Sequence, residues 1–249
     1  MSTLLLRLAA PMQSWGASSR FKKLATEREP TKSGLIGLLA AALGRERGED
    51  IKDLCALRFG VRIDQPGRIL RDYHTARHPN DVKRAFISER YYLSDAVFVA
   101  GLESEDEAFL RGISAALMSP RFPLYLGRRS CPPTGQIVLG ISELCLEDAL
   151  KSQEWQAHEW YMKRKRSEPI VNLEVVLDVP FESTGSFIRK DIPLSFNEKH
   201  RRYGLRSLAS DIKGASVDNP RASEAYQRIL EESQTKYKTE HDPYLDLGG

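Results

Sequence analysis

Two adjacent arginines near the middle of the chain are the residues best suited to chemistry with phosphate. Arg128 and Arg129 follow Gly127 and stand shortly before Pro132 and Pro133. A guanidinium presents a planar fork of donors that matches phosphate oxygens and can stack on a base, and glycine lets the backbone bend beside it. The pair therefore predicts contact with a nucleic-acid backbone. The alternative is an ordinary solvated surface, where most arginines are found.

A second candidate site lies at the start of a predicted helix over residues 31–44. Thr31 or Ser33 is suited to cap its N-terminus, and Gly44 is suited to end it. The N-terminus of a helix attracts anions, and Lys32 stands beside it. Lys32 and the region of Ser33 are therefore predicted to hold phosphate.

Residues 67–95 and the end of the first strand supply the other RNA-binding candidates. Arginine, tyrosine and histidine, which pair with phosphates and stack on bases, are frequent in this segment. The candidates within it are Arg71, Tyr73, His74, Arg77, Arg84 and Arg90. Gln13 and Trp15 follow the first strand; Trp15 either handles a base or anchors its loop in the core. The basic run at 163–166 is equally consistent with phosphate contact and with a solvated loop.

The elements that would position these residues follow the order βαββαβ. Apolar or alternating runs predict strands over 3–9, 58–63, 96–102 and 136–141, and periodic segments predict helices from residue 31 and over 105–118. This order is typical of the ferredoxin-like (RRM-like) fold, an α+β plan that RNA-recognition modules share. Residues 67–95 interrupt it as an inserted finger. A hairpin packed on the core through Ile69, Phe86 and Tyr91 is the structural alternative, and both can hold.

The rest of the chain is predicted to form a smaller C-terminal β region. Residues 170–179 have a strong strand pattern between two prolines, and residues 186–194 are candidates to pair with it. Residues 221–233 suggest a polar helix, with a frayed tail as the alternative. The predicted domains are a ferredoxin-like domain at 1–145, with the inserted finger at about 67–95, and a β region with a polar tail at 146–249.

Composition restricts the class of protein. The chain has 249 residues, of which 41% are hydrophobic, and a formal net charge of +3, so it suits a packed globular core. Its longest apolar run falls far short of the ~20 residues of a membrane span, and its start lacks a secretory pattern, so a cytoplasmic protein without membrane contact is expected. The three cysteines are too scattered for a disulfide framework or a zinc ribbon, and the spacing of His74 and His78 is broken by Pro79. No metal or cofactor is expected.

Four segments of the chain together indicate a family. In order, the segments are Leu6-Arg7-Leu8-Ala9 before Pro11-Met12-Gln13 and Trp15-Gly16; Pro30-Thr31 before Ser33-Gly34-Leu35; Leu70-Arg71-Asp72-Tyr73-His74-Thr75; and Tyr125-Leu126-Gly127-Arg128-Arg129-Ser130-Cys131-Pro132. The combination closely resembles the CasD family of type I-E CRISPR Cascade subunits, in the RAMP superfamily. The resemblance covers residues 1–145, whereas residues 146–249 match only loosely. Ala10 departs from the pattern, because relatives often carry glycine before this proline.

The resemblance implies a non-catalytic RNA-binding subunit of an antiviral ribonucleoprotein complex. It implies that the subunit caps the 5′ handle of the crRNA and joins the backbone subunit to the large PAM-reading subunit. Target DNA would be reached only indirectly, through the complex. It also implies that residues 67–95 form a thumb that presses on the guide RNA. An alternative use of the basic runs is contact with acidic protein neighbours.

The alternative function is metal-independent cleavage of CRISPR repeat RNA, because a superfamily relative in another CRISPR subtype cuts this RNA. Such a reaction needs a base for the 2′-hydroxyl and an acid for the leaving oxygen. Tyr73 and His74, with a nearby lysine or arginine, are the candidates. Adjacent residues of an extended chain point to opposite faces, so these two do not readily converge on one phosphate. The non-catalytic function is therefore favoured.

Overall fold

The computed structural model describes residues 1–16, 23–78, 81–197 and 200–223, with only the backbone described at 23, 76–78 and 81–86. The elements in these ranges are, in chain order, β1 (Ser2–Gln13), β2 (Lys23–Leu24), α1 (Lys32–Leu43), α2 (Lys52–Ala56), β3 (Arg58–Gln65), β4 (Arg68–His78), β5 (Asp81–Ser104), α3 (Glu107–Met118), β6 (Val138–Ser142), α4 (Leu146–Ser152), α5 (Glu159–Arg164), β7 (Ile170–Val179), β8 (Phe187–Ser195) and β9 (Arg202–Asp218). None of these helices is long and apolar enough to cross a membrane.

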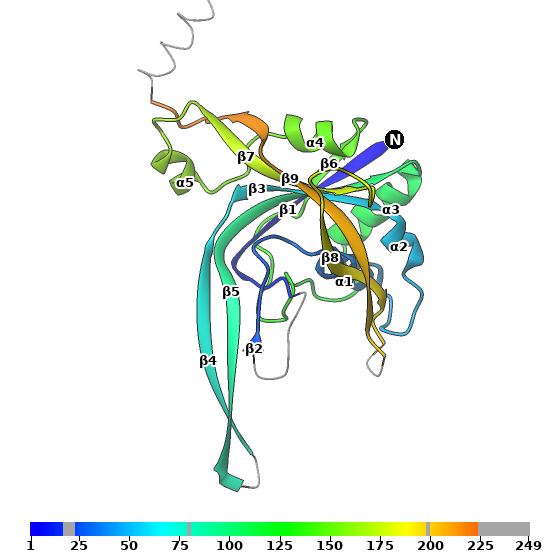
Figure 1. Cartoon of the computed structure of the whole chain (residues 1–249), viewed down its shortest axis with the longest axis vertical. Helices are drawn as coiled ribbons and strands as arrows, with labels where there is room; N and C mark the ends of the chain where they lie inside the picture. Colours follow the sequence, from blue (N-terminus) through cyan, green and yellow to red (C-terminus); the bar gives the residue numbers. More distant parts are fainter. Residues whose placement is uncertain (17–22, 79–80, 198–199, 224–249) are drawn as a thin grey trace, which may run out of the picture.

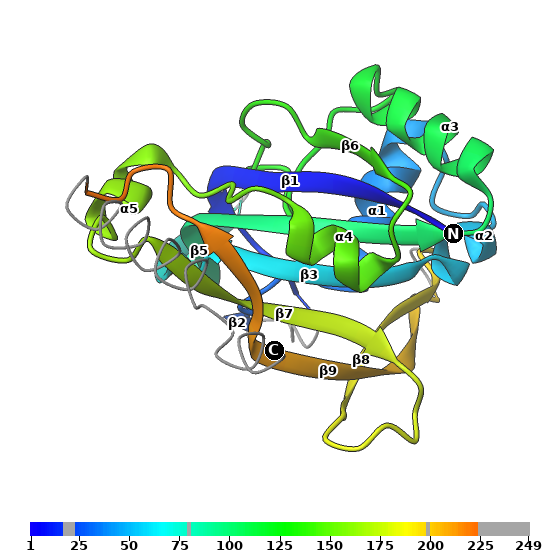
Figure 2. The same ribbon diagram turned by 90° about the horizontal axis from the view of Figure 1, so that it is seen from above.

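One sheet organises the described chain. Its strands lie in the order β6-β1-β5-β3-β7-β9-β8, and β2 and β4 pair with β5 (Figure 2). Neighbours along this path are antiparallel. The part β6-β1-β5-β3, with α1 and α3 in its crossovers, is the predicted βαββαβ arrangement. The ferredoxin-like α+β prediction is confirmed.

Both faces of β1 are covered, which explains why residues 4–10 are apolar except for Arg7. Leu4, Leu6 and Leu8 belong to the core under α1 and α3. Leu5 belongs to a second core with Val99 and α4. Successive side chains of a strand alternate between faces, so a strand with two covered faces needs a continuous apolar run. Figure 1 shows α4 above the sheet and α1 below it.

Helix α1 begins and ends at the residues that the sequence predicts. Thr31 caps its N-terminus, because the Thr31 side chain accepts a hydrogen bond from Gly34 N at 3.2 Å. Gly44 ends the helix with a φ of 78°, a left-handed conformation that favours glycine. The apolar residues between these caps belong to the larger core, and α1 contacts α3 and β8.

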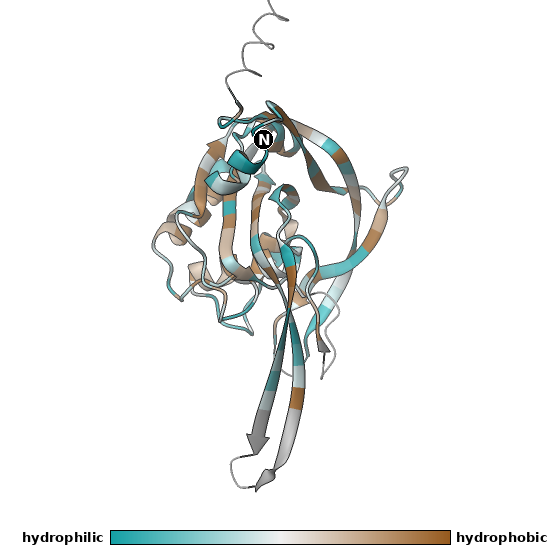
Figure 3. Ribbon diagram, turned by 90° about the vertical axis from the view of Figure 1, so that its left-hand side faces the viewer, coloured by the Kyte–Doolittle hydropathy of each residue, from teal (hydrophilic) through white to brown (hydrophobic). Residues whose placement is uncertain are grey.

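Strands β4 and β5 form a long hairpin that projects from the sheet (Figure 1). Beyond the hairpin, β5 continues into the sheet and pairs with both β1 and β3. The side chain of Ile69 is 51% exposed, so the hairpin is not folded onto the core through Ile69. In Figure 3 polar and apolar segments alternate along the hairpin, whereas the body strands carry longer apolar stretches. The predicted inserted finger is therefore a projecting β-hairpin.

The C-terminal strands extend the same sheet. Strand β7 has the bounds predicted for it, 170–179, and pairs with β3. The predicted pairing of residues 186–194 with β7 is wrong, because β9 lies between β7 and β8. Strand β9 mixes glycine, serine and charged residues without a strong apolar alternation, so its sequence did not predict a strand. The domain division at residue 145 stays a prediction, and most of the helix predicted over 221–233 lies outside the described residues.

Candidate nucleic-acid interface

The turn over residues 126–131 is fixed to the end of β1. Gly127 has a φ of 86°, in the left-handed region that favours glycine. A Cβ on Gly127 would lie 1.6 Å from the carbonyl oxygen of Ser14, so the backbone approaches too closely for any other residue. Across the turn, Cys131 N donates to Arg128 O at 2.8 Å. The two arginines of this turn are therefore held on a rigid backbone.

Arg128 lies between β2 and β5. Its Nη2 donates to the carbonyl oxygen of Leu24 at 2.8 Å, and its guanidinium carbon lies 4.7 Å from the centroid of the Tyr92 ring. A cation over an aromatic face is attracted by the ring, so Tyr92 fixes the plane of the guanidinium. Burial raises the pKa of Tyr92, but hydrogen bonds with Ser130, Arg128 and Arg90 outweigh burial, and the pKa lies below its ordinary value.

Two guanidinium N–H groups around Tyr92 are buried without an acceptor in the described structure. They are Nη1 of Arg128 and Nε of Arg90. An unpaired buried donor costs about 1–3 kcal/mol. Arg129 is exposed and has no side-chain partner within the described residues. We call Arg90, Tyr92, Arg128 and Arg129 the arginine–tyrosine cluster.

The hairpin presents its candidate residues on two faces. Directly paired residues of an antiparallel ladder share a face, and successive residues alternate. By this register, one face carries Arg71, Tyr73, Glu89 and Tyr91, and the other carries Asp72, His74, Ser88 and Arg90. The second face includes Arg90 and therefore continues the arginine–tyrosine cluster. Tyr73 and His74 point to opposite faces, as their adjacency predicts.

Two hairpin candidates have acidic partners. Arg71 Nη2 donates to Glu89 Oε1 at 2.6 Å, and His74 Nε2 lies 2.5 Å from Asp72 Oδ2. Ion pairs at such exposed positions stabilise a fold by about 0–1 kcal/mol, so a phosphate can replace the carboxylate at little cost. The Tyr73 side chain is 56% exposed and offers an open ring face.

Comparison with known proteins decides the family. Residues 3–209 match the family described as CRISPR-associated protein (Cas_Cas5). The chain belongs to this family. The chain is 40% identical over 159 residues to the CRISPR system Cascade subunit CasD of Escherichia coli (strain K12); the match covers 56% of this chain and 70% of that relative.

Two solved structures are similar to this Cas_Cas5 protein over nearly the whole of their length. A chain of "Crystal structure of Cas protein" has 39% identity and a TM-score of 0.67, covering 89% of this chain and 98% of that one. A chain of "CRISPR RNA-guided surveillance complex" has 30% identity and a TM-score of 0.71, covering 92% and 98%. The resemblance carried by the four sequence segments is confirmed.

Gln13 and Trp15 of the Cas_Cas5 protein lie in the core rather than on an RNA-facing surface. Both are 0% exposed, and Trp15 Nε1 donates to Gln13 Oε1 at 3.0 Å. Gln13 Nε2 in turn donates to the carbonyl oxygens of Leu8 and Ala96. Burial therefore contradicts the RNA contact predicted for Gln13 and the base contact considered for Trp15, and it agrees with the alternative that Trp15 anchors its loop in the core. They anchor the end of β1, and so support the Ser14 backbone against which the arginine turn packs.

Lys32 and Ser33 are also buried, so the phosphate contact predicted for them is not available. Lys32 Nζ pairs with Asp178 Oδ2 at 3.0 Å, and the Lys32 backbone N–H donates to Asp191 Oδ2 at 3.0 Å. The N-terminus of α1 does bind an anion, as helix termini do, but the anion is a carboxylate of this chain. Arg206 holds Asp191 in place with two further hydrogen bonds, at 2.5 and 2.7 Å.

The remaining predicted residues divide by what the structure describes. Arg77 and Arg84 lie on β4 and β5, but their side chains are outside the described part, so their RNA contact stays a prediction. Tyr92 was missed by the sequence reasoning, which named only the neighbouring Tyr91, in the alternative of a hairpin packed on the core. The signal that could have found it is the two-residue period, since Arg90 and Tyr92 share a face of a strand. No group of three metal-ligand side chains occurs among the described residues.

Proposed function

We propose that this chain is a subunit of a CRISPR RNA-guided surveillance complex in the cytoplasm, where it caps the 5′ handle of the crRNA. In this function it joins the backbone subunit to the large PAM-reading subunit. Similarity to CasD and to a chain of a surveillance complex supports membership of such a complex. The observation that carries the RNA contact is the pair of buried donors on Arg90 and Arg128 that lack acceptors, beside the exposed Arg129.

Phosphate is the ligand that suits these donors. Hydrogen bonds between a guanidinium and a phosphate are charge-assisted and roughly twice as strong as neutral ones. Arg128 is already oriented by Tyr92 and Leu24, so little side-chain freedom is lost when a phosphate binds. A backbone phosphate that accepts from Arg128 and Arg90 would lie beside the exposed Arg129, the next residue of the turn. The cluster thus favours a bent strand gripped through its phosphates.

The hairpin extends this proposed contact. The face with Arg90 and His74 continues from the cluster, and the opposite face offers Arg71 and the exposed Tyr73. Stacking of a base on an aromatic ring contributes about 1–3 kcal/mol. We assign the first face to phosphates near the handle and the second face to an unstacked base.

Catalysis is not part of the proposed function. Tyr73 and His74 lie on opposite faces of β4, so they do not offer an acid and a base to one phosphate. One observation favours the second candidate function, a metal-independent endoribonuclease: His74 Nε2 and Asp72 Oδ2 are 2.5 Å apart, a pair that can hold and move a proton. The two candidate functions predict different results for bound RNA: it stays intact in the first and is cleaved in the second.

The test is filter binding and gel analysis of a labelled CRISPR repeat RNA, with and without a divalent-metal chelator. The variant Arg128→Ala/Arg129→Ala is expected to lose tight binding, and the logarithmic salt slope should fall by roughly 0.7 for each lost phosphate contact. The matched control is Arg111→Ala/Lys151→Ala, which removes two exposed cations that pair within α3 and α4. Equal binding by both variants would contradict the proposed site. Specific cleavage that resists the chelator and is lost in His74→Ala would establish the endoribonuclease instead.

A further inference from the structure

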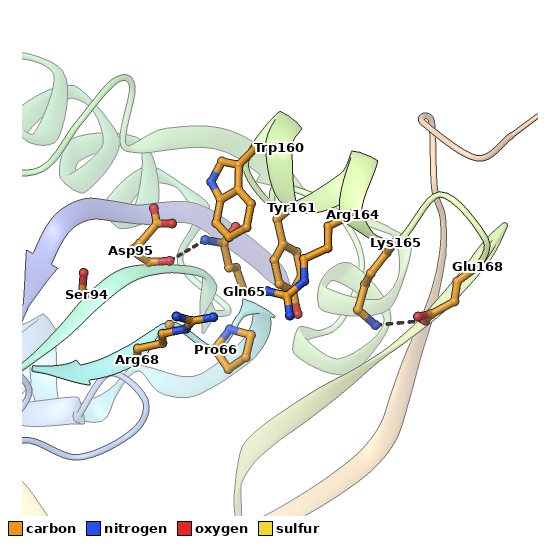
Figure 4. Close-up of a pocket in the computed structure, with 11 residues that line it drawn as sticks. Gln65, Pro66, Arg68, Ser94, Asp95, Trp160, Tyr161, Arg164, Lys165 and Glu168 are labelled. Atoms are coloured by element: carbon orange, nitrogen blue, oxygen red, sulfur yellow. Dashed lines mark hydrogen bonds and ion pairs between the residues drawn. The ribbon is translucent and has the colours of Figure 1, made fainter.

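A cleft lies at the base of the hairpin, beside α5, and shares no residue with the arginine–tyrosine cluster (Figure 4). Its volume is about 780 Å³. The side chains that matter for its chemistry are Gln65, Arg68, Asp95, Trp160, Tyr161 and Arg164. They come from the end of β3, the start of β4, the middle of β5 and α5, so only the folded chain brings them together.

Two cations that line the cleft, Arg68 and Arg164, form no ion pair within the described part of the chain. Lys165 Nζ pairs with Glu168 Oε2 at 2.9 Å, and Asp95 Oδ1 lies 3.4 Å from His158 Nε2. Arg68 and Arg164 are exposed, and in the described part of the chain neither side chain has an ion pair or hydrogen bond. The two guanidiniums enter the cleft from different elements, β4 and α5, which suits an anion held between them.

The cleft also has a fixed aromatic face. The Trp160 side chain is 48% exposed, and its ring meets Tyr161 edge-on at 5.6 Å between centroids and 83° between planes. Tyr161 in turn meets the buried Trp155 at 6.0 Å and 70°. Edge-to-face contacts of this kind hold rings in a defined orientation. Trp160 therefore presents one face to solvent on a rigid support.

The floor of the cleft is tied together by hydrogen bonds. Gln65 is buried; its Nε2 donates to the carbonyl oxygen of Asp95 at 2.5 Å, and its Oε1 accepts from the backbone N–H of His158 at 3.2 Å. Asp95 has a φ of 58°, a left-handed conformation that aspartate tolerates better than most residues. The start of α5 is thus anchored to the sheet on which Arg68 lies, and the cleft is formed before any ligand arrives.

We propose that this cleft binds one unstacked nucleotide of a single-stranded nucleic acid, with its base on Trp160 and its phosphate between Arg68 and Arg164. A planar ring and an anion are the two groups of a nucleotide, and the cleft offers one complementary surface for each. An acidic peptide would satisfy the arginines but would leave the indole face without a partner. The inference is independent of the arginine–tyrosine cluster, because it uses none of its residues.

The test is fluorine NMR of the full chain labelled with 5-fluorotryptophan, which carries three resonances, from Trp15, Trp155 and Trp160. The probes are the 5′-phosphorylated trinucleotides of adenosine and of deoxyadenosine. We expect either probe to shift the Trp160 resonance, assigned with Trp160→Phe, and to leave the two buried tryptophans unchanged. Arg164→Ala and Arg68→Ala should each weaken the apparent affinity about tenfold, as the loss of one charge-assisted hydrogen bond predicts.

Arg166→Ala is the matched control. Arg166 is exposed, belongs to the same basic run and does not line the cleft, so its loss should leave the shift intact. Unchanged Trp15 and Trp155 resonances show that each variant is folded. Binding of the ribose probe alone would support the inference and restrict it to RNA, and binding of both would support it for either strand. An unmoved Trp160 resonance, or an equal shift with triglutamate, would overturn it. Retention of the shift in Arg128→Ala/Arg129→Ala separates this site from the proposed handle contact.

Discussion

The N-terminus of α1 and the turn over 126–131 are both predicted from the sequence to bind phosphate, but they differ in the structure in whether a carboxylate of this chain already pairs with their cations. Both place cations beside a backbone suited to anions. At α1 the fold supplies its own anion, since Asp191 accepts from Lys32 N and Asp178 pairs with Lys32 Nζ. At the turn no carboxylate of the described residues pairs with the arginines, and Arg128 keeps a buried donor without an acceptor. An anion site remains available for a ligand only where the tertiary structure brings no internal counter-charge.

The largest expected effect is a loss of folding stability at the N-terminus of α1, where carboxylates of this chain already occupy the anion site. Asp191→Ala would leave Arg206 and the start of α1 without the carboxylate that both contact. Removing one partner from a buried ion pair costs about 3–5 kcal/mol, so the free energy of unfolding should fall by that amount in denaturant titration. Glu105→Ala, at an exposed position, is the control. A loss no greater than that of the control would break the comparison.

The next largest effect is expected in the turn over 126–131, where the backbone of Gly127 keeps the two arginines in place. Gly127→Ala would force a Cβ into contact with Ser14 O and place alanine in the left-handed region. The expected loss in unfolding free energy is about 2–3 kcal/mol, with weaker RNA binding because the arginine turn must move. Gly112→Ala, on α3 with nothing within 4 Å of its new Cβ, should be neutral or slightly stabilising. Wild-type RNA affinity in Gly127→Ala would show that the turn geometry does not matter for binding.

A crossed pair of substitutions sharpens the comparison further. Arg128→Ala should weaken RNA binding about tenfold and change the unfolding free energy by about 1 kcal/mol or less, since losing a buried donor without an acceptor offsets the loss of the Leu24 hydrogen bond and the ring contact. Lys32→Ala should lower the unfolding free energy by about 1.5–3 kcal/mol, because Asp178 loses one charged partner but keeps Arg206 and the Phe59 N–H, and it should leave RNA affinity unchanged. Both quantities are to be measured for both variants. If the Lys32→Ala variant is folded but loses RNA affinity, RNA contacts the N-terminus of α1, and the comparison is contradicted.

The smallest effect is a pKa shift within the cluster. The pKa of Tyr92 lies below its ordinary value, so its contribution to folding stability is present above the unfolded-state value of about 10 and is lost as pH falls through the folded-state value. Phosphate binding should draw Arg128 and Arg90 away from the phenol and raise the pKa again. The measurement is tyrosinate absorbance against pH, as wild type minus Tyr92→Phe, with and without RNA. Identical titrations would mean that RNA does not reach these arginines.

Sequence reasoning recovered the elements that local patterns determine. The caps of α1 at Thr31 and Gly44, the bounds of β7 and the inserted finger at 67–95 were predictable because capping, apolar runs and breakers act over a few residues. The pairing of β8 was mispredicted because β9 has a weak pattern and arrives from later in the chain. Strand partners are chosen by long-range contacts that periodicity does not record.

The sequence by itself determined the family, the βαββαβ plan and the presence of a glycine-supported arginine pair. Only the tertiary structure decided which cations are free, because that depends on carboxylates distant in the chain: Lys32 meets Asp178 across 146 positions, whereas Arg129 meets none in the described residues. It also decided that Trp15 is core and Trp160 is surface, two tryptophans that composition cannot tell apart. Residue type sets what a side chain can bind; burial and neighbouring charge set whether a ligand can reach it.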